Sequence, residues 1–177
     1  MAIKPKDPLL AAGKVMTILL MALTAIVSVF LLGLIPTMLF NQGDFAATIE
    51  LADGASVGTA LAASISLLII GAAITAMAFH FFQLLGRIID TVSNDDPLTV
   101  ENADRLSRMG WIALIFQIAT IPVGALVIFL GNNVPAENLK IDYDFSLTGL
   151  LLAVVLFILA RVFRHGAEMR ADLEGTV

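Results

Sequence analysis

Four long apolar stretches, separated by shorter polar segments, dominate the chain. An α-helix rises about 1.5 Å per residue, so roughly 20 apolar residues are needed to cross a hydrocarbon core of about 30 Å. All four stretches are near or above that length, and polar or charged residues follow each of them. We therefore predict four transmembrane helices, at about residues 15–40, 57–85, 111–130 and 145–163.

The apolar stretches are continuous and do not alternate with polar residues. Segments such as 67–70 and 150–156 lack the polar residue at every second position that a transmembrane barrel strand requires. Helices also satisfy their own backbone hydrogen bonds inside lipid. We expect an all-α fold, with a single four-helix transmembrane domain over residues 1–177. The first stretch is too long for the apolar core of a secretion signal, so we expect it to be retained.

The basic residues predict the orientation of these helices. Nine of the ten lysines and arginines lie before the first stretch, between the second and third, or after the fourth. The exception is Lys140, which shares the other two connections with six acidic residues, so the whole net charge of −5 resides there. An excess of basic residues is typical of cytoplasmic segments. We therefore predict that both termini, the connection 86–110 and the tail 164–177 are cytoplasmic.

Composition narrows the function classes. The chain is 59% hydrophobic and 14% charged, whereas a soluble domain is about half apolar and a quarter charged. It has no cysteine, which excludes disulfides, thiolate metal sites and cysteine nucleophiles. It also lacks a phosphate-binding Walker loop, a zinc-binding helix motif and a nucleophile elbow. We expect a protein that is not an enzyme, has no catalytic residue, cofactor or metal site, and does not bind nucleic acid directly.

The polar pattern of the connection 86–110 predicts a helix that runs into the third span. Residues 95–97, Asp-Asp-Pro, indicate a turn, and Thr99 is suited to cap a helix N-terminus. Val100, Ala103 and Leu106 recur every third residue and form one apolar stripe. Two interpretations stay open: an amphipathic entry to the membrane that packs on its own bundle, and a docking surface for a cytoplasmic partner.

The tail, residues 164–177, contains acidic and apolar residues in addition to the basic residues that end a transmembrane span. Arg161 and Arg164 can reach lipid headgroups. We expect the fourth helix to emerge from the membrane and to bend or loosen at Gly166. The acidic and apolar residues that follow, 168–177, are able to reach another chain.

These two segments resemble a known family. The similarity rests on Asp96-Pro97-Leu98-Thr99, on residues 102–106 (Asn-Ala-Asp-Arg-Leu), and on the endings 159–166 and 172–177. On these residues the chain resembles domain of unknown function 2975, a family of small four-span bacterial inner-membrane proteins. We expect the similarity to extend from the first span onward. Typical members have a small residue and Pro-Phe where this chain has Asp96-Pro97-Leu98.

The resemblance implies a multi-pass protein of the bacterial inner membrane with no catalytic residues to assign. Genes of this family often neighbour a small helix-turn-helix regulator. We therefore expect a regulatory membrane protein that holds such a DNA-binding regulator at the lipid bilayer. The candidate docking residues are Asp96, Pro97, Leu98, Asn102, Arg105, Leu106, Arg164, Gly166, Asp172 and Leu173.

Three polar side chains fall within the predicted spans. His80, Gln83 and Gln117 lie close to one edge of the membrane by residue count. They can hydrogen-bond across a helix contact, which is worth about 0.6 kcal/mol. Ionisable groups within a membrane also suggest a proton or ligand site. The alternative function is therefore a membrane transport or small-ligand-binding component with a polar site at these residues.

Small residues follow one another at helical spacing in the second span. The pairs Gly71/Thr75 and Ala72/Ala76 allow a neighbouring helix to approach closely. We favour packing within the monomer over a contact between copies in a homo-oligomer.

Overall fold

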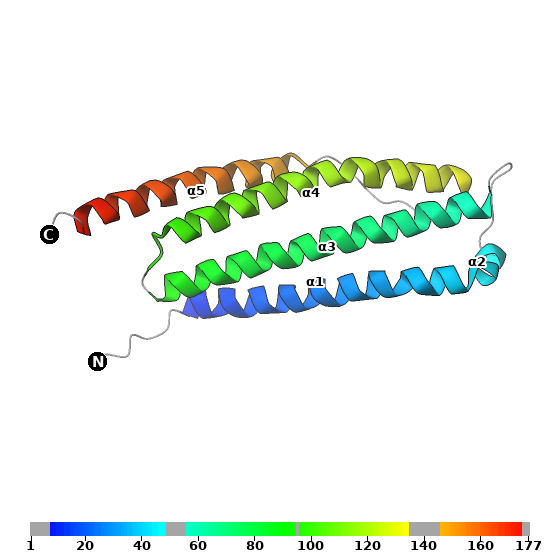
Figure 1. The fold of residues 1–177 in the computed structure, drawn as a ribbon, viewed down its shortest axis with the longest axis horizontal. Coiled ribbons are helices and arrows are strands. Elements are labelled where there is room, and N and C mark those ends of the chain that lie inside the picture. The colour runs from blue at the N-terminus through cyan, green and yellow to red at the C-terminus, as the bar shows by residue number, and fades with distance from the viewer. Residues whose placement is uncertain (1–7, 49–55, 95, 135–145, 175–177) are drawn as a thin grey trace. The chain divides into compact units, whose positions relative to one another are not determined.

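The computed structural model describes residues 8–48, 56–94, 96–134 and 146–174. It contains the helices α1 (Pro8–Phe40), α2 (Gln42–Thr48), α3 (Val57–Ser93), α4 (Val100–Asn133) and α5 (Leu147–Glu174) (Figure 1). No strand occurs in the described ranges, which confirms the all-α fold. The helices α1, α3, α4 and α5 are each long and apolar enough to cross a membrane, as expected for a multi-pass membrane protein.

The predicted spans lie within these helices, apart from the first residues of the fourth. Residue 145 is outside the described residues, and α5 begins at Leu147. All four long helices extend well past the predicted spans: α1 begins at Pro8, α3 continues to Ser93, α4 begins at Val100 and α5 continues to Glu174. The polar cluster 41–44, which follows the first span, is typical of a turn. Asn41 does form a turn, whereas Gln42 begins α2, with Asp44 in its first turn, where a carboxylate favours a helix N-terminus.

The chain packs as two compact units. Unit 1 comprises Met1–Thr24, Met77–Ile115 and Ser146–Val177, and unit 2 comprises Ala25–Ala76 and Phe116–Phe145. All seven described lysines and arginines belong to unit 1. The remaining charges of the orientation argument lie outside the described residues: Lys4, Lys6, Lys140, Glu50, Asp53, Glu137, Asp142 and Asp144. Cytoplasmic placement of the termini therefore stays a prediction.

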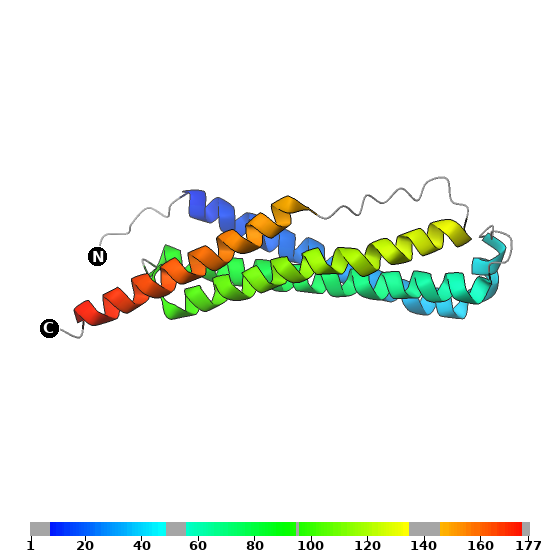
Figure 2. The same cartoon turned by 90° about the horizontal axis from the view of Figure 1, so that it is seen from above.

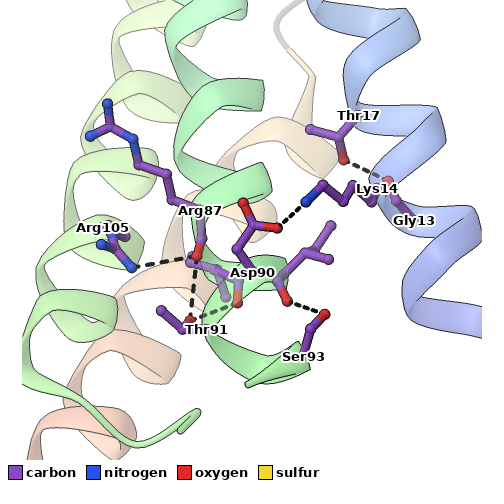
Figure 3. A network of polar contacts seen from close by, with 10 residues as sticks. Gly13, Lys14, Thr17, Arg87, Asp90, Thr91, Ser93 and Arg105 are labelled. Atoms are coloured by element: carbon purple, nitrogen blue, oxygen red, sulfur yellow. Dashed lines mark hydrogen bonds and ion pairs between the residues drawn. The ribbon is translucent and has the colours of Figure 1, made fainter. Parts of the chain in front are cut away.

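Within unit 1, α1 packs antiparallel to the last turns of α3. Gly13 faces Ile89, and Lys14 donates a 2.5 Å hydrogen bond to Asp90 (Figure 3). The helices α4 and α5 also run antiparallel, and they lie side by side in the two perpendicular views of Figures 1 and 2. The buried apolar residues of α3, α4 and α5 in this unit are Leu84, Ile88, Ala103, Leu106, Met109, Ile112, Ala113, Ala153, Leu156 and Ala160.

Within unit 2, the small residues of α3 pack against α1. A Cβ atom placed on Gly71 would lie 3.3 Å from a methyl group of Leu31, and the Ser28 hydroxyl donates to the Ala72 carbonyl at 3.4 Å. Small side chains at these positions let the two backbones approach closely. The expected packing within the monomer is therefore confirmed for Gly71 and Ala72, while a homo-oligomer stays a prediction.

The helix α1 exposes most of its apolar side chains. Thr17 is its only buried residue in the described part of the chain. Its hydroxyl donates to the Gly13 carbonyl at 2.7 Å, so the polar group is satisfied within the helix. Such an apolar surface suits lipid contact, because lipid tails are as apolar as the side chains they cover.

Candidate functional site

Asn102 is the centre of a hydrogen-bond network where α4 begins. Its amide nitrogen Nδ2 donates to the Thr91 hydroxyl at 2.7 Å and to the Pro97 carbonyl at 2.9 Å. Its Oδ1 accepts a 2.7 Å hydrogen bond from Arg105, and its backbone N–H donates to the Thr99 hydroxyl at 3.2 Å. The side chain is fully buried, at 0% exposure. Asn102 therefore ties α3, the α3–α4 connection and α4 together, and the predicted cap at Thr99 is confirmed.

Arg105 extends this network to the carbonyl of Arg87, which it approaches at 3.5 Å. Figure 3 shows this contact beside the Lys14–Asp90 pair, with the guanidinium of Arg87 directed away from both. The network leaves the charged group of Arg87 without a partner among the described side chains.

Two ion pairs join this region to α5. Arg164 donates to Asp104 at 2.7 Å, and Arg170 donates to Asp96. All four side chains are about half exposed. The connection 86–110 and the tail 164–177, which the sequence identified separately, thus contact each other in one unit.

Gly166 fits between these ion pairs. The helix α5 continues through this residue without interruption, so the expected loosening does not occur. A Cβ atom on Gly166 would lie 3.1 Å from the Leu98 side chain. The glycine admits Leu98 of the connection, and this close approach explains why a residue without a side chain is suited to this position.

The predicted apolar stripe on α4 is correct for Ala103 and Leu106, which are buried, but wrong for Val100, which is 49% exposed. Residues three positions apart are separated by about 300° around a helix, which is about 60° short of a full turn. A pattern that repeats every three residues therefore moves gradually off the original face. The buried face continues through Met109 and Ala113 instead, with steps of three and four residues.

The structure therefore separates the candidate docking residues into two groups. Asp96, Pro97, Leu98, Asn102, Arg105, Leu106, Arg164 and Gly166 make contacts within unit 1 or are buried there. Asp172 and Leu173 also take part in an interaction, but both are exposed on the last turns of α5. Sequence reasoning missed Thr91 and Asp90, the partners of Asn102 and Lys14. The only feature of the sequence that could have identified them is that each is a polar residue near the end of the mostly apolar helix α3.

The three polar residues of the predicted spans are divided between the two units. His80 Nδ1 lies 3.3 Å from Gln83 Oε1, three residues along α3 in unit 1. Gln117 belongs to unit 2 and is 6% exposed, and its Nε2 has no hydrogen-bond partner among the described residues. The backbone carbonyl of Gln117 accepts a 2.7 Å hydrogen bond from Thr120. In the described ranges no cluster of three histidine or acidic residues is placed to hold a metal ion.

We expect the exposed ion pairs to contribute little to stability. Replacing Asp104 with asparagine should lower the free energy of unfolding by about 0.5 kcal/mol, because half-exposed pairs are screened by solvent. Unfolding experiments in detergent at low and high salt should show the loss shrinking as salt rises. Glu101→Gln, on the same turn and without a described partner, is the control. A loss that exceeds this value several-fold and persists in high salt would contradict the expectation.

The family match includes both the connection 86–110 and the tail 164–177. No curated protein and no solved structure matches the chain. A family model described as "Protein of unknown function (DUF2975)" matches residues 59–177, which include α4, α5 and nearly all of α3. The match begins after α1 and α2, so it is narrower than the extent expected from the sequence. Because it spans more than half of the chain, the protein belongs to the DUF2975 family.

Proposed function

We propose that this protein is a non-enzymatic membrane protein that docks a cytoplasmic partner on the last turns of α5. The observation that carries the proposal is an apolar stripe, a pair of exposed apolar side chains on α5, beyond the predicted end of the fourth span. Met169 is 52% exposed and Leu173 is 71% exposed. Leu173 lies ten residues beyond the predicted end of the fourth span at residue 163, so it extends about 15 Å past the predicted membrane edge.

The stripe belongs to a structured part of the molecule. The ion pairs of Arg164 and Arg170 and the contact of Gly166 with Leu98 hold α5 against α4 and the α3–α4 connection. A helix fixed in this way presents Met169 and Leu173, four residues apart, on one face. A pre-ordered surface reduces the entropy that a partner must overcome on binding.

The charges beside the stripe favour a basic partner. Glu168 and Asp172 flank Met169 and Leu173 and are exposed. A small DNA-binding regulator fits this chemistry, since such proteins carry basic surfaces for phosphate contacts. Docking would then hold the regulator at the membrane and away from DNA. The regulator class agrees with the resemblance noted from the sequence, and bacterial inner-membrane localisation is part of the same proposal.

Crosslinking and co-purification test this proposal. We expect a cytoplasmic protein to be recovered with the wild-type chain, and Met169→Gln or Leu173→Gln each to weaken its binding about thirtyfold, the effect of losing roughly 2 kcal/mol of buried apolar surface. Ala171→Gln, exposed on the opposite face of the same turns, should leave recovery unchanged. If no cytoplasmic protein is recovered, or if recovery survives both stripe variants, the docking surface is not here.

Gln117 supports a second candidate function, the binding or transport of a small polar ligand. Its Nε2 is a hydrogen-bond donor buried in a predicted span without a partner in the described part of the chain. Such a donor costs free energy unless another group accepts its hydrogen bond. Solute flux into proteoliposomes that is lost in Gln117→Leu or His80→Leu, but kept in Leu173→Gln, would favour this function over docking.

A further inference from the structure

Two arginines occupy equivalent places on α4 and α5. Arg108 follows Asp104 by four residues and precedes Trp111 by three. Residues spaced by three and four positions share one face of a helix. Arg108 therefore lies on the face of α4 that carries both Asp104 and Trp111.

Arg161 has the same spacing on α5. It follows Phe157 by four residues and precedes Arg164 by three, so it shares a face with both. The two faces meet, because Arg164 pairs with Asp104 at 2.7 Å and the ring of Phe157 packs edge-on against Trp111 with 5.5 Å between centroids. In antiparallel helices this register places Arg108 and Arg161 at the same level, between the two contacts.

No described side chain neutralises this arginine pair. Asp104 is engaged by Arg164, and Glu168 lies 3.7 Å from His165. Neither Arg108 nor Arg161 makes a hydrogen bond or ion pair among the described residues. Two guanidinium groups at the same level of neighbouring helices repel each other, and an anion bound to both removes that repulsion.

The surroundings of the pair indicate which anion fits. Trp111 is 57% exposed where the apolar part of α4 begins, and tryptophan is typical of the boundary between lipid and water. A shallow hollow of about 590 Å³ follows the same part of α5, lined by Ile158, Arg161, Val162, Arg164, His165 and Glu168. Its apolar end suits an acyl chain, and Arg161 suits a phosphate group.

We propose that Arg108 and Arg161 form a binding site for an anionic phospholipid, with both guanidinium groups on the headgroup phosphate and an acyl chain along Trp111 and Ile158. Guanidinium groups bind phosphate oxygens through paired hydrogen bonds. The level of Trp111 places the site within reach of the bilayer surface, where anionic lipids attract basic side chains. This site does not depend on the docking of a cytoplasmic partner.

Trp111 is the only tryptophan of the chain, so its fluorescence reports the site directly. The full-length protein is reconstituted into phosphatidylcholine vesicles that contain either brominated phosphatidylglycerol or brominated phosphatidylcholine, both of which quench a neighbouring indole. We expect the anionic lipid to quench Trp111 more strongly at equal mole fraction. Arg108→Gln and Arg161→Gln should each weaken this preference about fivefold, the effect of one basic residue near an anionic surface.

The matched control is Arg87→Gln, which removes the same charge from an exposed arginine on α3 whose guanidinium has no described partner. It should leave the preference unchanged, and quenching by brominated phosphatidylcholine should be equal in all variants if Trp111 keeps its depth. Equal quenching by both lipids in the wild type, or an Arg87→Gln loss as large as that of Arg108→Gln, would overturn the proposal. So would displacement of the anionic lipid by inorganic phosphate at matched ionic strength, which would indicate a soluble phosphate ligand.

Discussion

Replacing Asn102 with alanine is expected to lower the free energy of unfolding by about 3 kcal/mol. The substitution removes two hydrogen bonds donated by Nδ2 and one accepted by Oδ1. A neutral hydrogen bond contributes about 1 kcal/mol and one to a charged group about 1.5 to 3 kcal/mol. The side chain is fully buried, so water does not replace the lost partners.

Unfolding of the purified protein in mixed micelles, followed by helical circular dichroism, measures this loss. Asn132→Ala is the matched control, because Asn132 is exposed on the last turn of the same helix. Asn102→Asp keeps the size and the acceptor for Arg105 but removes both donors, so it should also destabilise the protein. If Asn102→Ala behaves like Asn132→Ala, the network does not hold the start of α4.

Replacing Gly110 with alanine is expected to destabilise the protein, although alanine is the better helix former. A Cβ atom at Gly110 would lie 3.0 to 3.1 Å from three ring atoms of Phe157, and that ring also packs against Trp111. Overpacking costs about 1 to 3 kcal/mol, whereas the gain in helix propensity is at most about 1 kcal/mol. We expect a net loss of about 1 kcal/mol.

Gly131, also in α4, provides a control, because its replacement by alanine should change the free energy of unfolding in the opposite direction. A Cβ atom there meets nothing within 4 Å, so Gly131→Ala should stabilise the protein by about 0.5 to 1 kcal/mol. Unfolding in the same micelles compares the two variants. In a Phe157→Leu background the loss caused by Gly110→Ala should shrink. A gain in stability from Gly110→Ala in the wild-type background would exclude the close contact with Phe157.

The transmembrane helices could be predicted well because their signal is local. A run of apolar residues long enough to cross lipid identifies a span without knowledge of any other helix. The cap at Thr99 is equally local, since its hydroxyl serves an amide three residues away. The end of α5 was harder to predict from the sequence. A glycine by itself suggests a weak point in a helix, whereas Gly166 leaves room for the Leu98 side chain.

The candidate docking residues illustrate a different limit. Asp96 and Arg170 are 74 residues apart, and Asp104 and Arg164 are 60 residues apart. Each looks like a solvated charge in the sequence, and only the packing of α5 against α4 and the α3–α4 connection shows that they pair. Under the docking proposal, the surface available to a partner is therefore smaller than the sequence suggested, and the exposed Met169 and Leu173 lie at its centre.

The sequence by itself determined the four membrane-length helices and the separation of basic from acidic connections. Both depend on the length and composition of single segments. Only the tertiary structure decided that Asn102 is a buried link, that the two polar segments bind each other, and that Arg108 and Arg161 share one level. The physical reason is that contacts between helices depend on their rotation and register. Those quantities are set by the packing of all the helices in a unit, and no single segment specifies them.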